Sequence, residues 1–301
     1  MILVTGAAGF VGSRIIARLV GQNVRPRAMV RSRESAQRKL PAQGFEMVYA
    51  DTTRPETLRP ALSGVDTIIH CAFLTADRKP APGESYFETN TTGARNLVAA
   101  ARDVGVQRII VLSGLGSQPG RPGSYLETRY LAEQAVKESG LGWSILGPSV
   151  LFGTGAAFFH GLANLIVSAP VITPVIGSGN LRFQPVWVED VVTCLLKMVD
   201  APETYNQRVI EVGGPEIYSY NEILDMLMVA LGKRRMKLHG PRPIAKIVAT
   251  AMSAALSNPP ITPAAMELFE FENTTALDSI PYNFGFQPAS FRAWLAENGV
   301  A

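Results

Sequence analysis

A glycine-spaced turn near the start of the chain has the residue types needed to hold phosphate groups. The apolar run from Met1 to Val4 leads into the segment Thr5-Gly6-Ala7-Ala8-Gly9-Phe10-Val11-Gly12, and helix-patterned residues 13–20 follow. Glycines at this spacing allow a tight turn, close approach of the backbone to a pyrophosphate and close helix–strand packing. Free N–H groups and the helix dipole then hold the phosphates. We predict a dinucleotide site contacted by Gly6, Gly9, Phe10, Val11 and Gly12.

The end of the expected second strand carries the residues that select the dinucleotide. NAD-selective proteins usually place an acidic residue there to hold the ribose hydroxyls, whereas NADP-selective proteins place arginine. This chain has no acid at that place and has Arg31 and Arg33 instead. A guanidinium fits the extra phosphate and can stack on adenine; a solvated basic loop is the alternative, because Arg38 and Lys39 follow. We predict that NADP(H) is preferred over NAD(H).

Two further candidates for the cofactor site, Asp51 and Thr52, follow the expected third strand. The carboxylate of Asp51 could accept a hydrogen bond from the adenine amino group. It could equally cap the helix that follows. The sequence leaves both roles open.

The elements that position these residues alternate between apolar strand-like runs and helical patterns. Such alternation implies right-handed crossovers and a parallel sheet covered on both faces. We therefore predict an α/β fold with a doubly wound parallel sheet of the Rossmann type. The expected strands are residues 1–5, 27–30, 46–50, 67–71, 108–113, 143–147 and 208–213, and the expected helices are residues 15–20, 56–62, 86–104, 125–139 and 190–199.

The texture of the chain changes after Val150, where Gly, Pro and Phe become frequent, and the part after Pro215 is mainly helical with proline breaks. We expect two domains whose pieces interleave. Residues 1–150 and about 186–214 would form the dinucleotide-binding domain. Residues of about 151–185 and 215–301 would form a smaller, mainly helical substrate or interaction domain.

Composition is that of an ordinary globular protein, with 301 residues, 47% hydrophobic and 18% charged. The net charge of +3 is too small to indicate a nucleic-acid partner. Cys71 and Cys194 are the only cysteines and both lie in apolar runs, so we expect neither a disulfide nor a nucleophilic thiol. No metal-ligand spacing, leader peptide or membrane-spanning run is evident, and we expect a cytoplasmic protein, with a peripheral place on the inner face of a membrane as the alternative.

Several segments together resemble the extended and atypical short-chain dehydrogenases/reductases. They are the glycine turn, Ile68-Ile69-His70-Cys71-Ala72 and Asn90-Thr91-Thr92-Gly93-Ala94-Arg95-Asn96-Leu97. Within that group the strongest likeness is to the nucleotide-binding accessory subunits of respiratory complex I and their bacterial relatives. That likeness rests on residues 144–153, 182–191 and 211–215.

The resemblance implies a catalytic group built on a tyrosine followed four residues later by lysine. Positions i and i+4 lie side by side on a helix, so the cation can lower the tyrosine pKa and also bind the nicotinamide ribose. The matching pair here is Tyr125 and Arg129, and arginine keeps the charge but cannot release a proton near neutral pH. The third member would be Ser113 or Ser117, donating to a substrate carbonyl.

The same resemblance implies further cofactor contacts. Asn90 would take part in a water relay, or would only bond backbone inside its own helix. His70 is expected to be a core residue without a catalytic role. The remaining contacts implied at strand ends are Cys71, Ala72, Pro148 and Ser149.

Three functions remain open on this reading. The first is an NADP(H)-binding oxidoreductase that moves hydride to or from a small carbonyl, enone or quinone-like substrate. The second is a non-catalytic nucleotide-binding subunit that stabilises a membrane respiratory complex. The third is a redox-sensing regulator. The oligomeric state is left open.

The C-terminal part contains two segments with distinct patterns. Residues 243–256 are apolar on many sides, and core packing is the expected reason, with a docking face for a membrane complex or a substrate lid as the alternatives. The acidic run from Glu267 to Glu272 is expected to be an amphipathic surface element. Phe158, Phe159, His160 and Trp187 are candidates to line an apolar pocket.

Overall fold

The computed structural model describes residues 1–168, 171–256, 259 and 261–300. The chain divides into two compact units that interleave along the sequence. Unit 1 comprises Met1–Leu74, Pro80–Gly147 and Val191–Ile210, and unit 2 comprises Thr75–Lys79, Pro148–Asp190 and Glu211–Ala301. The expected borders at residues 150, 186 and 214 lie close to these divisions.

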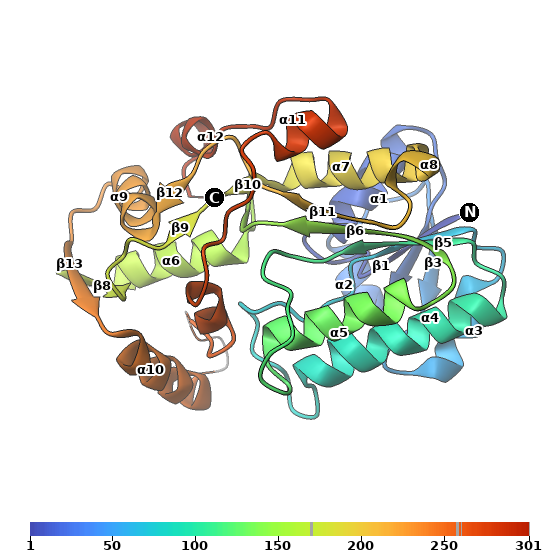
Figure 1. Ribbon diagram of the computed structural model, residues 1–301, viewed down its shortest axis with the longest axis horizontal. Helices are drawn as coiled ribbons and strands as arrows, with labels where there is room; N and C mark the ends of the chain where they lie inside the picture. Colours follow the sequence, from blue (N-terminus) through green and yellow to red (C-terminus); the bar gives the residue numbers. More distant parts are fainter. Residues whose placement is uncertain (169–170, 257–258, 260, 301) are drawn as a thin grey trace. The chain divides into compact units, whose positions relative to one another are not determined.

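Unit 1 is organised around a seven-stranded sheet with the order β11-β6-β5-β4-β1-β2-β3 (Figure 1). The six strands from β3 across to β6 pair in parallel, and β1 lies between β2 and β4. Strand order therefore reverses at β1, which is the point where doubly wound sheets bind ligands at the carboxyl ends of their strands. The strands are β1 (Ile2–Thr5), β2 (Arg27–Val30), β3 (Glu46–Tyr49), β4 (Thr67–His70), β5 (Arg108–Leu112), β6 (Gly142–Pro148) and β11 (Arg208–Val212).

Helices cover both faces of this sheet, as the alternating pattern predicts. Helices α3, α4 and α5 lie on one face, and α1 and α7 lie on the other (Figure 1). The core beneath the first group combines Leu3, Ile68 and Ile109 from the strands with Leu97 and Val136 from the helices. The helices are α1 (Gly12–Gly21), α2 (Arg33–Gln37), α3 (Leu58–Leu62), α4 (Gly93–Asp103), α5 (Tyr125–Lys137), α7 (Val188–Asp200) and α8 (Pro202–Tyr205), with a short 3₁₀ turn η1 (Pro55–Thr57).

One expected helix differs in its first part. Residues 86–104 were predicted as a single helix, but the structure forms a π-helical segment, η2 (Phe87–Thr92), before α4 begins at Gly93. A π-turn carries one more residue per turn than an α-turn and occurs often at functional sites. Asn90 and Thr91 of this segment are fully buried.

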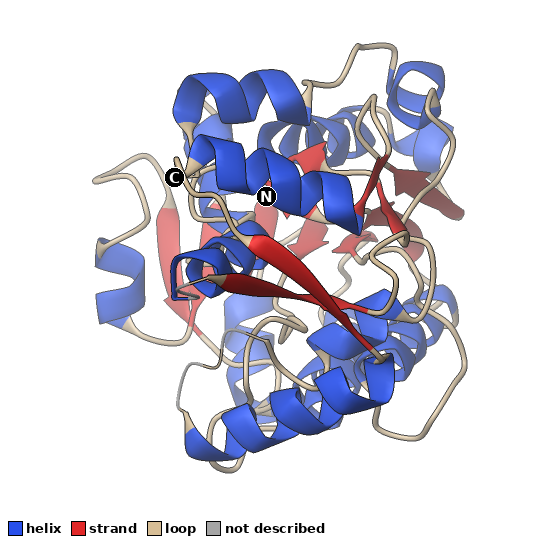
Figure 2. Ribbon diagram, turned by 90° about the vertical axis from the view of Figure 1, so that its left-hand side faces the viewer, coloured by secondary structure: helices blue, strands red, loops and turns tan. Residues whose placement is uncertain are grey.

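Unit 2 contains strands that the sequence pattern did not reveal, arranged as three two-stranded ribbons. These are β7 (Leu151–Phe152) with β10 (Val186–Trp187), β9 (Arg182–Phe183) with β12 (Tyr218–Ser219), and β8 (Ile172–Ile176) with β13 (Met236–Gly240). Figure 2 shows them in red among the helices. The helices are α6 (Ala157–Ser168), α9 (Tyr220–Ala230), α10 (Arg242–Ala255), α11 (Ser279–Phe284) and α12 (Phe291–Asn298), with a 3₁₀ helix η3 (Ala265–Phe269).

Aromatic rings form much of the core of unit 2. Phe183 packs against Phe158 and Phe269, and Phe159 packs against Phe291 with ring centroids 4.7 Å apart. Edge-to-face and tilted pairs at these separations add to the free energy gained by burial alone. Phe158 and Phe159, expected as pocket-lining residues, thus contact other aromatic side chains of unit 2.

One expectation for the C-terminal part is wrong. Core packing of residues 243–256 is contradicted, because Ala249 alone is buried among the residues of α10 and the apolar residues Ile244, Ile247 and Val248 are exposed. There the pattern gave the helical period but not the side that faces the protein. The run from Glu267 to Glu272 is amphipathic as expected, with Phe269 buried and Glu270 and Glu272 exposed, although Glu267 is buried as well. None of the helices in the described part of the chain has the length and apolar character that a bilayer crossing requires.

The carboxyl ends of β1 and β4 are tied together by one buried hydroxyl. Thr5 Oγ1 accepts hydrogen bonds from the backbone N–H groups of Cys71 and Ala72, and lies 2.7 Å from Nδ1 of His70. Because the Thr5 hydroxyl oxygen already accepts two hydrogen bonds from the backbone, the hydroxyl donates its own proton in a hydrogen bond to Nδ1 of His70. The neutral His70 ring therefore carries its proton on Nε2. Burial, with a smaller contribution from the charge of Arg129, lowers the pKa of His70 to about 3. This confirms that His70 is a core residue.

We predict that His70 makes the protein less stable in mild acid. Below the unfolded pKa of about 6.5, the unfolded chain binds a proton that folded His70 does not, so the free energy of unfolding falls with pH. Between pH 6.5 and pH 5 the loss is about 2 kcal/mol. The free energy of unfolding of His70→Asn, measured with urea across this pH range, is expected to lack that part of the pH dependence.

His239 provides the matched control, because it is exposed on β13. His239→Gln is expected to keep the pH dependence of the parent protein. Equal pH slopes in His70→Asn and the parent would contradict the buried neutral state of His70.

Candidate functional site

The glycine turn between β1 and α1 has no room for side chains. A Cβ atom at Gly12 would lie 2.2 Å from the carbonyl oxygen of Gly6, and one at Gly9 would lie 2.9 Å from the same atom. Gly6 has a φ of +63°, and a Cβ there would lie 2.8 Å from the carbonyl oxygen of Cys71. Each of the three predicted glycines is therefore required by a backbone contact, and the turn stays open for a pyrophosphate at the start of α1.

Arg31, which follows β2, is paired with an acid that the sequence analysis did not single out. Its Nη1 lies 3.1 Å from Oε1 of Glu84, and the Arg31 side chain is 55% exposed. Glu84 is mostly buried and also accepts from the backbone N–H of Ala81. Arg33 is exposed at the first position of α2. A 2′-phosphate at this place would compete with Glu84 for Arg31.

The structure gives Asp51 a role in its own turn. Its Oδ1 accepts from both the backbone N–H and the hydroxyl of Thr53, each at 2.9 Å. Arg54 is the residue before η1 and has no side-chain cap, so Asp51 does not cap that helix. The adenine contact of Asp51 stays a prediction. Thr52 is buried beside the start of α4, where its carbonyl accepts from Asn96.

Asn90 holds the loop after β4 against α5. Its Oδ1 accepts from the backbone N–H of Leu74 at 2.8 Å, and its Nδ2 donates to the Leu74 carbonyl and to Thr128 Oγ1. Leu74 lies outside the helix of Asn90, so this amide does not bond only inside its own helix, and the water relay stays a prediction. Both polar atoms of the amide are used to join three segments of unit 1.

Arg129 is a buried cation fixed at the carboxyl end of β5. Its Nη2 donates to the carbonyl of Leu112 at 2.9 Å, and its guanidinium carbon lies 4.6 Å from the centre of the Phe73 ring. It also lies 5.7 Å from the ring centre of Tyr125, one helical turn earlier on α5. The Nε of Arg129 is buried and has no hydrogen-bond partner among the described residues. The structure thus brings together the predicted pair, Tyr125 and Arg129.

Tyr125 is the first residue of α5, and Ser124 caps that helix by accepting from the backbone N–H of Glu127. The Tyr125 ring is largely buried and meets the Tyr86 ring edge to face, with centroids 5.7 Å apart. The Tyr86 ring, the Arg129 guanidinium and the helix cap therefore set the position of the phenol.

Ser113 follows β5, and its hydroxyl is hydrogen-bonded to an acidic side chain. Its Oγ donates to Oε1 of Glu133 at 2.5 Å and lies 3.1 Å from Ser117 Oγ. Glu133 is buried on α5, and Lys137 Nζ lies 3.7 Å from its other oxygen. Because the Ser113 hydroxyl donates its hydrogen bond to Glu133, its oxygen can only accept a hydrogen bond from another group. Both candidate serines lie together, so the structure does not separate them by position.

Pro148 and Ser149 belong to unit 2, at and after the end of β6. Ser149 is buried, and its hydroxyl donates to the carbonyl and side-chain oxygens of Asn273. Its role in unit 2 is thus to hold the segment that contains Asn273. The nicotinamide contact expected for these two residues stays a prediction.

A continuous series of contacts runs from the glycine turn to Tyr125. Gly6 approaches Cys71, the backbone N–H of Phe73 donates to the Cys71 carbonyl, and Phe73 lies under Arg129, which faces Tyr125. Burial raises the pKa of the Cys71 thiol to about 12, although the charge of Arg129 opposes the shift. Cys71 is therefore a neutral packing residue, and neither Cys71 nor Cys194 forms a disulfide.

Three residues at this site escaped the sequence analysis. Glu133 stands four residues after Arg129 on the same face of α5, and this spacing could have revealed it. Phe73 and Glu84 lie in the segment after β4 that has no regular period, so no pattern could have placed them. Arg129, the partner of Phe73, is 56 positions away in the sequence, and Arg31, the partner of Glu84, is 53 positions away.

The residues present fit a bound dinucleotide. The glycine turn leaves a cradle that a side chain would fill, and it lies at the strand-order reversal of a parallel sheet. The buried Arg129 Nε–H is a donor without an acceptor among the described residues, as expected where a bound molecule supplies one.

Comparison with known proteins agrees with this geometry. The chain is similar to the mitochondrial NADH dehydrogenase (ubiquinone) 1 alpha subcomplex subunit 9 of Arabidopsis thaliana, with 24% identity across 91% of this chain and 68% of that protein. It is also similar to the ceramide reductase of Caulobacter vibrioides, with 27% identity across 100% of this chain and 98% of that protein.

Solved structures show the same fold. The dTDP-glucose 4,6-dehydratase DesIV of Streptomyces venezuelae superimposes with a TM-score of 0.73 at 19% identity, covering 99% of this chain and 97% of that one. A family model described as NAD(P)H-binding matches residues 6–156, half of the chain. Gly6, Gly9 and Gly12, strands β2 to β6 of the sheet and the paired Tyr125 and Arg129 lie within that match. The chain is therefore a member of the NAD(P)H-binding family of Rossmann oxidoreductases, with the fold of the atypical short-chain dehydrogenases/reductases.

Proposed function

We propose that this protein is an NADP(H)-dependent oxidoreductase that moves hydride between the nicotinamide and a carbonyl, enone or quinone-like substrate. The observation that supports this best is the series of contacts from Gly6 through Phe73 and Arg129 to Tyr125. It ties the phosphate-binding turn to a phenol within one rigid network. A proton donor held in fixed relation to the cofactor cradle is what hydride transfer to a carbonyl needs.

Tyr125 is the proton donor in this proposal. A bound NADPH, held at the glycine turn, would supply a hydride to the carbonyl carbon, so that a C–H bond would form there as the C=O bond becomes single. The Tyr125 hydroxyl gives its proton to the carbonyl oxygen, so a ketone becomes an alcohol and the phenol recovers its proton from solvent. The balance is one hydride from the cofactor and one proton from water.

Arg129 replaces the usual lysine as the cation beside the phenol. Its charge favours the ionised form of Tyr125 that remains after proton transfer. Because arginine stays protonated, it cannot pass a proton onward, and the Leu112 carbonyl and the Phe73 ring fix its position. Its role is electrostatic, and its unpartnered Nε–H is the group we assign to a hydroxyl of the nicotinamide ribose.

Ser113 has a different role from the one expected. Its proton is held by Glu133, so it does not donate to the substrate oxygen while that bond persists. The buried pair instead joins the end of β5 to α5, the helix that presents Tyr125 and Arg129. Ser113 is thus assigned as a positioning residue.

The substrate class is suggested by the side chains of the site and by the name of one relative. Tyr125, Tyr86 and Phe73 give the site an aromatic character. The similar protein from Caulobacter vibrioides is named a ceramide reductase. A small or elongated apolar carbonyl compound is therefore the first class to screen.

A second function is favoured by the same rigidity. Arg129 and Ser113 are both held by protein groups, an arrangement that also suits a subunit that binds its nucleotide permanently within a membrane respiratory complex. The relation to a complex I subunit of Arabidopsis thaliana supports this alternative. The rate of nucleotide release separates the two, because an enzyme must exchange its cofactor in every turnover.

Replacement of Tyr125 by phenylalanine tests the leading proposal. Tyr125→Phe removes the proton donor, so NADPH-dependent reduction of an accepted ketone or quinone is expected to slow about 100-fold or more. The dissociation constant for NADPH, measured by fluorescence titration, is expected to stay within about twofold because the ring contacts remain.

Tyr130→Phe is the matched control, since Tyr130 is the next tyrosine of α5 and is absent from the network of Tyr125. Its turnover is expected to equal that of the parent. Unchanged turnover in Tyr125→Phe would remove the tyrosine from the mechanism. Slow nucleotide release without reduction of any substrate in the screen would favour the subunit alternative.

Nucleotide preference is tested at Arg31. The parent is expected to bind NADPH more tightly than NADH, and Arg31→Ala is expected to weaken NADPH binding about tenfold with little change for NADH, because a charge-assisted hydrogen bond to phosphate is lost. Glu84→Gln is expected to strengthen NADPH binding, since it frees Arg31 from its carboxylate partner. Isothermal titration of each variant with both nucleotides measures these changes.

Arg95→Ala provides the control for removal of one exposed positive charge, because Arg95 is on α4 and is exposed. It is expected to change neither affinity. Equal affinities for NADH and NADPH in both the parent and Arg31→Ala would refute the assignment of Arg31.

A further inference from the structure

One exposed surface of unit 2 combines apolar side chains with positive charge, and the proposed catalysis does not use it. It consists of the outward side of β13 and of α10, with the basic residues beside them. We call it the α10–β13 surface and define it by Met236, Leu238, Ile244, Ile247 and Val248 together with Lys233, Arg234 and Arg242.

The apolar stripe of helix α10 faces solvent, whereas that of a core helix faces the protein interior. Ile244, Ile247 and Val248 are spaced i, i+3 and i+4, which puts them on one face, and they are 57%, 69% and 49% exposed. The other face carries the buried Ala249, α10 is in contact with η3, and Lys246 lies 3.9 Å from Glu270. The helix is thus fixed to unit 2 by small and polar contacts while its large aliphatic side chains face outward.

The ribbon of β8 and β13 continues this exposed apolar surface. Side chains alternate along β13, so Met236 and Leu238 share the outward side and are 70% and 60% exposed. The parallel register sets Met236 beside Ile172 of β8, which is also exposed. Only Pro241 separates β13 from α10, and Figure 2 shows the ribbon and α10 on the side that faces the viewer.

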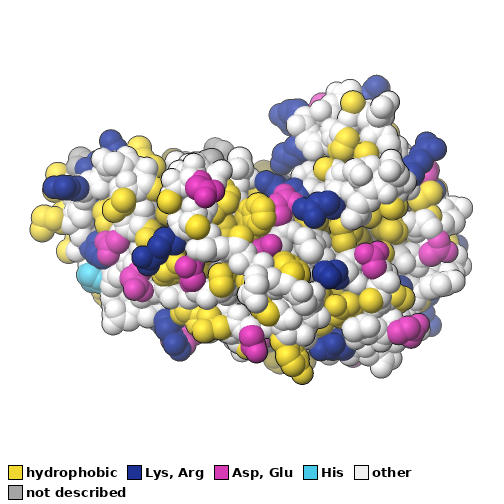
Figure 3. Space-filling model, turned by 90° about the horizontal axis from the view of Figure 1, so that it is seen from above, with side chains coloured by type: hydrophobic (Ala, Val, Ile, Leu, Met, Phe, Trp, Pro, Cys, Tyr) yellow, Lys and Arg dark blue, Asp and Glu magenta, His cyan; other side chains and the backbone are white. Residues whose placement is uncertain are grey.

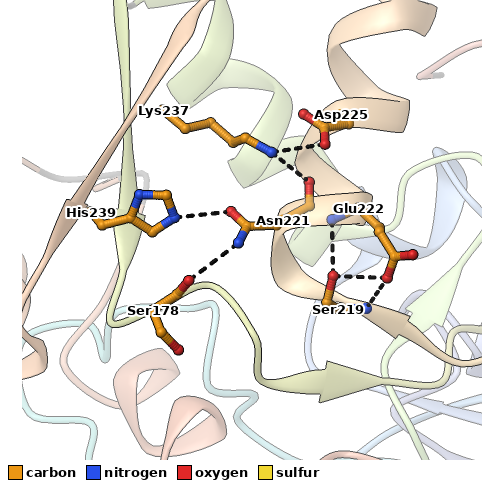
Figure 4. Close-up of polar contacts among 7 residues, drawn as sticks. All are labelled: Ser178, Ser219, Asn221, Glu222, Asp225, Lys237 and His239. Atoms are coloured by element: carbon orange, nitrogen blue, oxygen red, sulfur yellow. Dashed lines mark hydrogen bonds and ion pairs between the residues drawn. The ribbon is translucent and has the colours of Figure 1, made fainter.

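The side of β13 opposite Met236 and Leu238 makes polar contacts with α9, which fix the orientation of the strand. Lys237 donates to Asp225 of α9 at 2.7 Å, and His239 Nε2 lies 3.2 Å from the side-chain oxygen of Asn221 (Figure 4). Asn221 in turn donates to the carbonyl of Ser178. Because these groups anchor β13 to α9, Met236 and Leu238 cannot turn inward without breaking an ion pair.

Positive charge surrounds the exposed apolar side chains. Between Asp225 and Glu267 the sequence has no acidic residue, whereas it has Lys233, Arg234, Arg235, Lys237, Arg242 and Lys246. Lys233, Arg234 and Arg242 are exposed at the two ends of β13. At the end of the molecule where β8 and β13 lie, Figure 3 shows hydrophobic and basic side chains next to one another, with acidic side chains also present. Asp225, which accepts from Lys237 of β13, is an acidic residue of this region.

We propose that the α10–β13 surface docks on an anionic lipid membrane. An amphipathic helix that presents aliphatic residues with Lys and Arg beside them inserts at the boundary of headgroups and acyl chains, and the basic residues are attracted to anionic headgroups. The charge is complementary to such a surface, and its aliphatic side chains gain burial that the protein does not provide. A membrane on this face would bring unit 2 to the place where apolar substrates are dissolved.

Vesicle flotation of the full chain tests this proposal without involving the nucleotide. The protein is expected to float with phosphatidylcholine vesicles that contain 30% phosphatidylglycerol and to stay behind with phosphatidylcholine alone. Added salt is expected to weaken the binding, because it screens the charges. Ile247→Asn and the double variant Arg234→Glu, Arg242→Glu are each expected to lower the partition coefficient about tenfold or more.

The matched control is Tyr282→Asn, because Tyr282 is 80% exposed on α11, outside the α10–β13 surface. It is expected to bind vesicles as the parent does, and circular dichroism checks the fold of every variant. Equal binding to neutral and anionic vesicles would overturn the proposal. So would an absence of vesicle binding together with dimers in analytical ultracentrifugation that Ile247→Asn abolishes, which would assign the surface to a second copy of the chain.

Discussion

The close approach of β1 and β4 at the point where strand order reverses governs the rest of unit 1. The backbone of the turn after β1 lies so near the Cys71 carbonyl that only glycine fits at position 6. Thr5 Oγ1 holds the same junction by accepting hydrogen bonds from the backbone N–H groups of Cys71 and Ala72. Because this junction fixes the segment after β4, it also fixes Phe73, and through Phe73 the guanidinium of Arg129. Cofactor turn and phenol thus share one support.

Arg129 shows how a change of one residue type alters a whole site. A lysine at this position would be flexible and able to exchange protons, whereas the planar guanidinium is held by a carbonyl and a ring. The adjacent Ser113 and Glu133 pair is equally fixed. The site therefore has its charges in place before any ligand arrives, which lowers the reorganisation needed on binding and limits how far the site can adapt to different substrates.

Local patterns were sufficient for the fold. At the glycine turn, Gly6, Gly9 and Gly12 each meet a short-range backbone contact that any chain with this turn must have, and their contact with the cofactor stays a prediction. The partner of Arg31 could not be predicted in the same way, because Glu84 comes near Arg31 only when the sheet forms. Glu133 differs, because its place four residues after Arg129 on α5 could have indicated it. Helix α10 failed for a related reason: periodicity reports that one side is apolar, but it does not report what that side meets.

The π-helical segment η2 has a consequence for the evolution of chain length in this protein. Its wide turn allows consecutive residues, Asn90 and Thr91, to reach separate partners, one in the loop after β4 and one at the Thr128 carbonyl of α5. Loss of a single residue from this turn would convert it to an ordinary α-helix and rotate the following residues by about 100°. Insertions and deletions are therefore excluded from residues 87–92 far more strongly than substitutions, and this segment should keep a constant length among related chains even where its side chains vary.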